Sequence, residues 1–282
     1  METNLKVQEI KEHLIKCASS KDIGGIRKIS TEYNLVDIAE SLETIESKKI
    51  LFIIRALKTE VSAEVFSSLN IELQEEIINK FSGSEIKEIT KELFSDDISE
   101  LFDELPASLK NKIIKNTSKK QRDEINQILN YEPNTAGSLI TTEYVWVYTH
   151  FTVKQALNKI KELYTKNKNI ETFQYLYVTD IYRNLKGVIT LPDLIFERQN
   201  KKISSIIKNQ QIVSVLDTED QEKAIEIMRK YDFPSLPVVN KEYKVIGIIT
   251  FDDALEVVEE EATEDIHKMA AISPTETEYS KT

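Results

Sequence analysis

Carboxylate side chains are concentrated in residues 250–266, which read TFDDALEVVEEEATEDI. Eight acidic residues and no lysine or arginine lie between Asp252 and Asp265. A helix would place four of them in one row, because their spacing is three, four and four residues: Asp253, Glu256, Glu260 and Glu264. Like charges at this spacing repel each other and weaken an isolated helix. The stretch is therefore either a solvated acidic face or one side of a cation site.

The same helix would carry an apolar row on another face, made of Leu255, Val258 and Ala262. These residues recur at positions i, i+3 and i+7, which is typical of the buried stripe of an amphipathic helix. We therefore expect this row to be the packed face of the helix.

A second group of carboxylates lies in SDDISE, residues 95–100. Asp96 and Asp97 follow Ser95 in the first turn of an expected helix, where acidic side chains favour the positive end of the helix dipole. Glu100 lies one turn after Asp96 on the same face, so the two could also act as a pair of oxygen ligands. Both interpretations stay open at this point.

Two strand ends in the second half of the chain combine a threonine with an aspartate. They belong to two copies that superpose without a gap at an offset of 60: residues 176–195 (LYVTDIYRNLKGVITLPDLI) and 236–255 (LPVVNKEYKVIGIITFDDAL). Thr190 and Asp193 in the first copy correspond to Thr250 and Asp253 in the second. Such hydroxyl and carboxylate groups could cap the following helix, or they could hold a ligand beside its N-terminus.

Each copy reads strand, turn, strand and helix, and each is preceded by a strand and a helix. We expect these preceding strands at residues 145–148 and 212–215 and the helices at 153–164 and 220–231. One such unit cannot bury its sheet alone, so the two must pack together. Through its two G-[VI]-I-T-x-x-D strand ends and the LPVV strand, the repeat resembles a pair of cystathionine-β-synthase (CBS) modules. The resemblance implies ATP as a second candidate ligand beside Thr190, Asp193, Thr250 and Asp253, although Pro192 stands where a nucleotide-binding member would have a basic residue.

The first half of the chain must be helical, because residues 1–131 contain no convincing period-two alternation. Cap-like residues recur about every 12 positions, the length of a three-turn helix and a tight turn: Ser47, Thr59, Asn70, Ser84, Ser95, Pro106 and Ser118. Helices this short are marginal alone and must stack on neighbours. We therefore predict an α plus α/β fold, with an N-terminal α-solenoid-like helical domain followed by the tandem CBS pair.

The chain changes character at residues 131–142, where a proline, a glycine and small polar residues precede an alternating strand. We take this segment as the domain boundary and as a hinge. The predicted domains are a helical domain at residues 1–131, CBS modules at 132–200 and 201–262, and the start of a linker at 263–282.

The composition excludes several classes of protein. The chain has 48 acidic and 37 basic residues, a net charge of −11, which disfavours nucleic acid as a partner. Cys17 is the only cysteine, so no disulfide can form within the chain and a reducing cytosol fits. The start, METNLKVQEIKEH, is not a signal peptide, and no apolar run approaches the roughly 18–20 residues of a membrane span. We expect a soluble, intracellular chain.

The parts of the chain together resemble the cytosolic region of the MgtE magnesium channels. The resemblance rests on SDDISELFDELP (95–106), YEPNTAGSLITTEYV (131–145), the CBS pair and FDDALEVVEEEATEDIHKMA (251–270). It implies a helical superhelix domain, a CBS pair and a connecting helix that leads into five membrane helices. The chain ends at Thr282, about where that connecting helix would begin. We therefore expect the regulatory half of a channel, at the cytoplasmic face of the cell membrane.

The resemblance also implies that Mg²⁺ ions bind between acidic faces of the helical domain and the CBS pair. The matching positions in the helical domain are Glu64, Asp96 and Glu100. Those in the CBS pair are the backbone of Gly137 and the side chains of Asp193, Asp220, Glu222, Asp232 and Asp253. Those in the acidic helix are Glu256, Glu261, Glu264 and Asp265. All are the hard oxygen ligands that Mg²⁺ and Ca²⁺ prefer, and the chain has no EF-hand loop.

The expected mechanism is electrostatic. Two carboxylates about 4 Å apart repel each other by roughly 4 kcal/mol at an effective dielectric near 20. Without metal, the acidic faces should swing apart about residues 131–142, whereas Mg²⁺ between them should favour a closed form. In a full channel this would close the pore when intracellular Mg²⁺ is ample.

Two other interpretations stay open. The chain could be a nucleotide-sensing CBS regulator with the helical domain as a docking arm, or a scaffold whose helices carry a protein partner. Catalysis is not expected, because we find neither a nucleophile–base pair nor a P-loop. The family resemblance also implies a homodimer through the CBS pair and a membrane channel domain as a partner.

Overall fold

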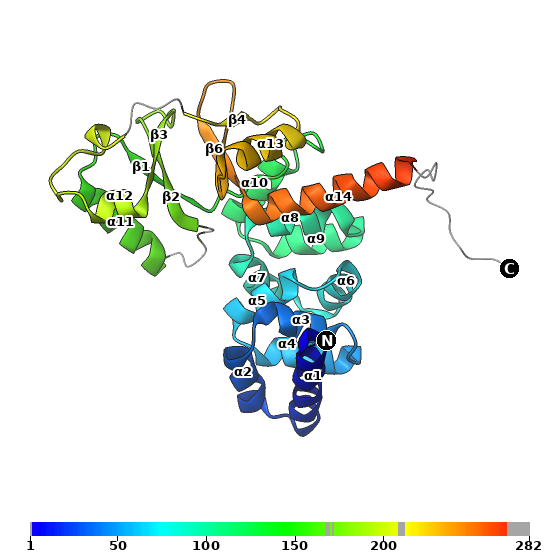
Figure 1. The fold of residues 1–282 in the computed structure, drawn as a ribbon. Coiled ribbons are helices and arrows are strands. Elements are labelled where there is room, and N and C mark those ends of the chain that lie inside the picture. The colour runs from blue at the N-terminus through cyan, green and yellow to red at the C-terminus, as the bar shows by residue number, and fades with distance from the viewer. Residues whose placement is uncertain (1, 167–169, 171, 208–211, 270–282) are drawn as a thin grey trace. The chain divides into compact units, whose positions relative to one another are not determined.

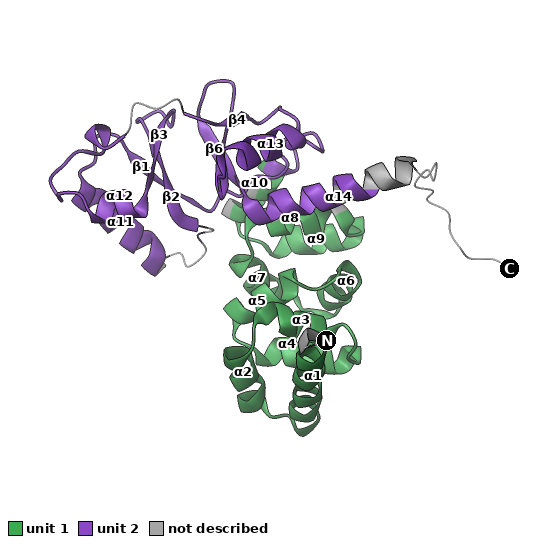
Figure 2. Cartoon of the chain, viewed as in Figure 1, with its two compact units in different colours: residues 1–127 green, residues 128–282 purple. Residues whose placement is uncertain are grey.

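The computed structural model describes residues 2–166, 170, 172–207 and 212–269 (Figure 1). The chain divides into two compact units, residues 1–127 and 128–282 (Figure 2). Each unit has its own hydrophobic core. The domain limits at residues 131, 200 and 262 stay predictions.

The first unit is a stack of short helices (Figure 1). They are α1 (Glu2–Ser20), α2 (Ile23–Glu32), α3 (Leu35–Leu42), α4 (Ser47–Ala56), α5 (Thr59–Ser67), α6 (Ile71–Lys80), α7 (Gly83–Glu92), α8 (Ser95–Glu104), α9 (Ala107–Asn116) and α10 (Lys119–Ile128). From α2 to α10, each helix begins twelve residues after the one before it, at residues 23, 35, 47 and so on to 119. The period predicted from the cap-like residues is confirmed.

The predicted helix starts are correct to within two residues. Asn70 caps α6 by accepting a hydrogen bond from the amide of Leu73 at 3.1 Å. The largest difference is at α7, where Ser82 rather than Ser84 is the cap. Ser82 and Glu85 form a reciprocal capping box there, and this second hydrogen bond decides where the helix begins.

Helices two apart in the chain lie side by side, α1 with α3, α3 with α5, α5 with α7 and α7 with α9. These helices carry buried apolar residues, for example Ala63 and Phe66 on α5 and Ile86 and Ile89 on α7. Helices of ten residues cannot bury such residues by themselves, so each depends on its neighbours in the stack. The predicted α-solenoid-like domain is confirmed.

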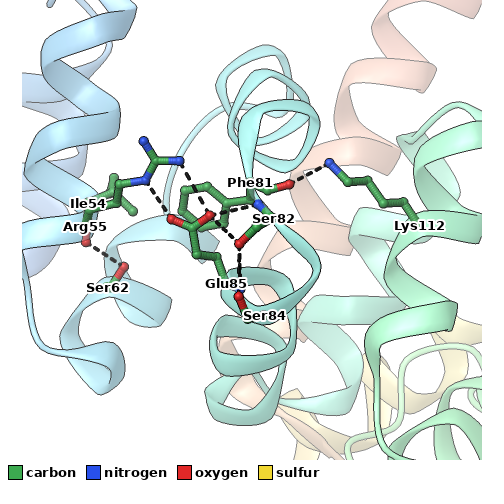
Figure 3. A network of polar contacts seen from close by, with 8 residues as sticks. All are labelled: Ile54, Arg55, Ser62, Phe81, Ser82, Ser84, Glu85 and Lys112. Carbon is green, nitrogen blue, oxygen red and sulfur yellow. Dashed lines mark hydrogen bonds and ion pairs between the residues drawn. The ribbon is translucent and has the colours of Figure 1, made fainter.

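The carbonyl groups at the ends of several helices are bonded by side chains from later helices. Lys112 on α9 donates to the carbonyl oxygens of Ile78, Asn79 and Phe81 at the end of α6, at 2.8, 3.0 and 2.7 Å. Figure 3 shows the contact with Phe81, and it shows Ser62 bonded in the same way to the end of α4. The last carbonyl groups of a helix have no partner within it, so these side chains complete the hydrogen bonding between repeats.

An ion pair joins α4 to α7 beside this contact (Figure 3). Arg55 Nε lies 2.7 Å from Glu85 Oε1, and the Arg55 guanidinium lies 5.6 Å from the Phe81 ring centroid. Although burial acts to raise it, hydrogen bonds from Arg55 and Ser82 lower the pKa of Glu85 to about 2. Glu85 is therefore both the capping residue of α7 and a link between two helices of the stack.

The second unit contains two three-stranded sheets of the same design. The first module has β1 (Tyr144–Tyr148), α11 (Val153–Lys166), β2 (Thr172–Thr179), β3 (Leu185–Thr190), α12 (Leu191–Ile195) and a 3₁₀ turn η1 (Ile203–Ser205). The second has β4 (Val215–Leu216), α13 (Gln221–Tyr231), β5 (Ser235–Val239), β6 (Val245–Thr250) and α14 (Phe251–Met269). In each sheet the first strand is parallel to the second, which is antiparallel to the third.

The two copies predicted at an offset of 60 residues have equivalent strand pairing. Leu176 pairs with Ile189 in the first sheet as Leu236 pairs with Ile249 in the second. Most of the predicted element limits agree, but the strand predicted at residues 212–215 is reduced to β4, which begins at Val215.

Residues 134–141 are not a hinge, and this part of the sequence interpretation is wrong. The Gly137 amide donates to the Asp217 carbonyl at 2.9 Å, and Thr141 and Ile248 exchange two backbone hydrogen bonds of 2.9 and 3.0 Å. The segment is therefore an added edge of the second module, joined to it by backbone groups of Asn134, Ala136, Gly137 and Thr141. The boundary between the compact units lies before it, between residues 127 and 128.

The acidic helix is confirmed as α14, but its packed face is not the predicted one. Leu255 and Val258 are 47% and 44% exposed, and Ala262 is exposed as well. The buried residues are Ala254 and Val257, one position earlier, on the side that packs against α13. The tertiary contact with α13 decides the orientation, and it leaves the predicted apolar row in solvent. No helix among the described residues is both long and apolar enough to cross a membrane.

Candidate functional site

The two predicted threonine–aspartate pairs cap the helices that follow their strands. Asp193 Oδ2 accepts hydrogen bonds from the Thr190 amide and hydroxyl, both at 2.7 Å. Asp253 does the same for Thr250 at 3.3 and 2.5 Å, and burial raises the pKa of Asp253. The capping interpretation is confirmed, and contact of these carboxylates with a ligand would come in addition to it.

A cavity of about 300 Å³ opens beside the first of these pairs. Aromatic rings and hydroxyl groups from both modules line it, together with the capping carboxylate: Tyr175, Tyr177, Thr190, Asp193, Phe233 and Ser235. Its size is at the lower end of small-molecule sites. Rings that can stack on a base and oxygens that can bond a ribose make this a chemically reasonable nucleotide cavity.

Four of the predicted metal ligands gather around the first turn of α13. Asp220 caps that helix and accepts a hydrogen bond from the Glu222 amide at 2.8 Å. Gln221, between them, donates its side-chain amide to Glu261 on α14 at 3.3 Å. Gly137 lies in the segment that is hydrogen-bonded to the residues just before this turn. The local fold thus brings two acidic helix segments and a backbone strip to one place.

Asp217 belongs to the same region, and the sequence interpretation missed it. Its backbone carbonyl accepts the Gly137 amide, and its Oδ1 is buried with no hydrogen-bond partner among the described residues. A buried carboxylate oxygen without a donor is unfavourable, so a cation or a water molecule would stabilise it. The signal that could have found it is the acidic run in DTED, residues 217–220.

The candidates of the helical unit lie on α5 and α8. Glu64 is exposed on α5. Glu100 is exposed on α8, where it lines a cavity of about 220 Å³ together with Asp97 and Glu104. Asp97 Oδ2 also accepts the Phe94 amide at 3.2 Å, which is a capping contact. Asp96 lies in the first turn of the same helix, and its side chain is outside the described part of the structure.

The remaining candidates are separate from these groups. Asp232 ends α13 in a left-handed conformation with φ of 52° and is exposed. Glu256 is exposed on α14. Glu264 and Asp265 lie further along α14, and their side chains are outside the described residues, as is that of Glu260.

No three histidine, cysteine, aspartate or glutamate side chains within the described residues gather closely enough to hold a metal ion. Mg²⁺ keeps several waters and is held in proteins by as few as one or two carboxylates. Single carboxylates and pairs are therefore what each unit offers by itself, and they are of the right chemical type.

Comparison with known proteins decides the family. The family model of the MgtE intracellular N domain matches residues 33–134, and that of the CBS domain matches residues 136–200 and 203–260. The crystal structure of the cytosolic domain of the Mg²⁺ channel MgtE in complex with ATP is 30% identical to this chain. The match covers 88% of this chain and 99% of that one, with a TM-score of 0.78. The chain belongs to the MgtE family.

Other magnesium-transporter relatives agree. The crystal structure of the soluble part of a magnesium transporter covers 91% of this chain and 99% of its own, at 27% identity and a TM-score of 0.84. The magnesium transporters MgtE of Thermus thermophilus and Bacillus subtilis are 33% and 27% identical over 92% and 96% of this chain. The chain spans 58% and 59% of the length of these two transporters. It matches the part of MgtE that was solved as the cytosolic domain, and the predicted family and fold class are confirmed.

Proposed function

We propose that this chain is the Mg²⁺-responsive part of an MgtE-type magnesium transporter, working at the cytoplasmic face of the cell membrane. One observation carries the proposal: the candidate oxygen ligands are divided between the two compact units. Glu64 and Glu100 belong to the helical unit, whereas the group around the first turn of α13 belongs to the CBS unit. Each unit by itself supplies only a few carboxylates. If the two units came together, their carboxylates would form sites with more oxygen ligands for a metal ion.

The physical basis is the charge of the carboxylates that the two units would bring together. Two such groups about 4 Å apart repel each other by roughly 4 kcal/mol at an effective dielectric near 20. A Mg²⁺ ion bound by carboxylates of both units would neutralise their repulsion and link the units. Because the ion would bind the closed form of the chain more tightly than the open form, it would shift the population of molecules towards the closed form. In this proposal the pivot lies between the end of α10 at Ile128 and residue 134, where the hydrogen bonds to the second module begin.

Within the CBS unit, the Mg²⁺ ligands that we propose lie around the start of α13, as separate oxygen groups and not as one assembled cluster of three carboxylates. Asp220 and Glu222 would supply carboxylates, Gly137 a backbone oxygen and Glu261 a further carboxylate from α14. Asp217, with its buried unbonded oxygen next to Gly137, joins this set. All of these groups are hard oxygen ligands, as Mg²⁺ requires. The other predicted positions, Asp193, Asp232, Asp253, Glu256, Glu264 and Asp265, stay predictions.

The double variant Asp96→Asn with Glu100→Gln should weaken Mg²⁺ binding about tenfold or more, because it removes two negative charges one turn apart on α8. Titration calorimetry with MgCl₂ at fixed ionic strength measures this. The matched control is Glu72→Gln with Glu75→Gln, which removes two exposed charges from α6. Equal Mg²⁺ affinity in the parent and in both double variants would show that the α8 carboxylates are ordinary helix-terminal acids.

A nucleotide is a second candidate ligand, and the 300 Å³ cavity beside Thr190 and Asp193 favours it. The relative solved with ATP supports the same choice of ligand class. ATP should raise the melting temperature of the chain in EDTA, and Thr190→Val should reduce that rise, because it removes the hydroxyl group from the cavity. The absence of any shift with ATP would exclude this candidate and leave the Mg²⁺ proposal untouched. If neither ligand changed anything, the scaffold interpretation would remain.

We also propose that the chain is a homodimer through its CBS unit. Large apolar side chains are exposed at equivalent positions of the two modules, Ile195 at 58% and Leu255 at 47%, offset by 60 residues. Phe196 and Phe251 beside them are 87% and 53% exposed. Exposed apolar patches of this kind mark interaction sites. Because the two modules expose apolar residues at equivalent positions, the same surface of a second chain could pack against them in a symmetric dimer.

Sedimentation velocity at tens of micromolar should therefore show a dimer of the 32.5 kDa chain. Ile195→Asp with Leu255→Asp should convert it to the monomer, because charges buried without partners oppose association. Val36→Asp, at a residue 61% exposed on α3, is the control and should leave the dimer intact. A parent protein that sediments only at 32.5 kDa would count against the dimer.

A further inference from the structure

Two cationic side chains converge on the ring of Trp146 in the first CBS module. Lys159 Nζ, from α11, lies 2.8 Å from the ring centroid, and the Arg183 guanidinium carbon, from the turn between β2 and β3, lies 4.3 Å from it. Trp146 itself is on β1. Three separate elements thus supply the cluster, and all three side chains are half-buried.

Neither cation forms an ion pair with a carboxylate in the described part of the chain. Two lysines of the β2–β3 and β5–β6 hairpins do have carboxylate partners: Lys186 lies 3.2 Å from Asp180, and Lys244 pairs with Glu242. Lys159 and Arg183 are thus half-buried cations whose charge has no carboxylate partner among the described residues.

The position of Arg183 is held by contacts that do not neutralise it. Its Nη2 donates to the Tyr144 hydroxyl at 2.9 Å, and that hydroxyl donates to the Val245 carbonyl at 3.2 Å. The Arg183 backbone is left-handed, with φ of 73°, and is held by hydrogen bonds to Asp180 and from Val245. A long, charged side chain in such a defined place has lost its conformational freedom already, which lowers the cost of binding a ligand.

The two cations also oppose each other. Burial, together with the charge of Arg183, lowers the pKa of Lys159 to about 7. The face of an indole ring attracts a cation, but it adds no negative charge and accepts no ordinary hydrogen bond. An anion bound by the ammonium and guanidinium groups together would reduce their repulsion and use N–H donors that have no acceptor in the described structure.

We propose that Trp146, Lys159 and Arg183 form a binding site for a phosphate group. A phosphate dianion matches two positive charges, and its several oxygens can accept hydrogen bonds from an ammonium and from a guanidinium fork at the same time. The site is separate from the nucleotide cavity, whose lining includes none of these three residues. The phosphate could come from a small soluble ester or from a lipid headgroup, since the recognising chemistry is the same.

Trp146 is the only tryptophan of the chain, so its fluorescence reports on this site directly. The full chain should be titrated with inorganic phosphate, with AMP, and with phosphatidylcholine vesicles that contain phosphatidylglycerol, at constant ionic strength and with chloride as the blank. We expect a saturable change in emission, because the anion draws the cations away from the ring. Saturation by phosphate or AMP identifies a soluble source, and saturation by the vesicles alone identifies a lipid headgroup.

Lys159→Gln and Arg183→Gln should each weaken the response about tenfold, whereas Arg183→Lys keeps the charge and should weaken it less. Lys230→Gln is the matched control, because Lys230 lies 5.2 Å from the Tyr231 ring in the second module. Its titration should equal that of the parent. The proposal is overturned if no probe gives a saturable change, or if the change is as strong in Lys159→Gln and Arg183→Gln as in the parent.

Discussion

Replacing Lys112 with methionine should destabilise the helical unit by about 3 kcal/mol, the scale of a hydrogen-bonded charged group. The ammonium group of Lys112 bonds three carbonyl oxygens at the end of α6, at 2.7 to 3.0 Å. Methionine keeps most of the side-chain length and volume but donates nothing. Three carbonyl groups would then lose their donor at once, in a stack where α9 has to meet the end of α6.

The two compact units can be followed separately in this experiment. Trp146 reports only on the CBS unit, whereas the far-ultraviolet circular dichroism is dominated by helices, many of them in the helical unit. We expect the urea midpoint seen by circular dichroism to fall while the midpoint seen by Trp146 fluorescence stays. Lys115→Met is the control, since Lys115 is exposed on the same helix. Equal midpoints for the two lysine variants would contradict the role assigned to Lys112.

Gly137→Ala should destabilise the CBS unit by about 2 kcal/mol, as expected of overpacking in a close-packed place. A Cβ atom at Gly137 would lie 2.5 Å from a ring carbon of Tyr131 and 2.8 Å from the Asp217 carbonyl oxygen. The second of these atoms is backbone and cannot turn aside. The substitution should therefore loosen the edge formed by residues 134–141 and shift the Trp146 unfolding midpoint to lower urea.

Gly24→Ala is the matched control for this prediction. Gly24 lies in α2, and the nearest atom to an added Cβ would be Asp22 Oδ1 at an ordinary contact distance of 3.4 Å. Alanine is favoured over glycine in a helix by up to about 1 kcal/mol, so this variant should be neutral or more stable. If both substitutions had the same small effect, the close approach at Gly137 would not be structurally important.

The sequence predicted those parts of the fold that depend on local pattern. The twelve-residue helical period follows from cap residues such as Asn70 and from short apolar rows, and the two sheets follow from the offset of 60 between Gly187 and Gly247. These features need only neighbouring residues in the chain. A resemblance to a known family then added the order of the domains.

Features that depend on tertiary contact were not predicted correctly. The row of Leu255 and Val258 has helical spacing but is exposed, because α13 covers the side with Ala254 instead. The segment around Gly137 has the composition of a linker, yet it is bonded to the second module. Nothing in the sequence indicated that Lys159 and Arg183 would meet at one ring, since they are 24 positions apart and strand β2 lies between them.

The candidate site could be predicted in its chemistry but not in its geometry. Acidic runs identify oxygen ligands by residue type, and the structure gathers Asp220, Glu222 and Glu261 around one helix turn. The spacing of acidic residues in the sequence did not distinguish these candidate metal ligands from carboxylates that cap helices, such as Asp193 and Asp253. Whether a carboxylate binds metal depends on which other segments face it, and this is a property of the folded chain.

The most direct test of the proposed Mg²⁺ response is small-angle X-ray scattering of the full chain, with EDTA and with millimolar MgCl₂ at the same ionic strength. We expect the radius of gyration to fall with Mg²⁺ and to saturate, because the ion replaces repulsion between carboxylates by a bridge between the units. Potassium chloride at matched ionic strength should not reproduce the effect. A radius of gyration that is the same with and without Mg²⁺ would contradict the proposal.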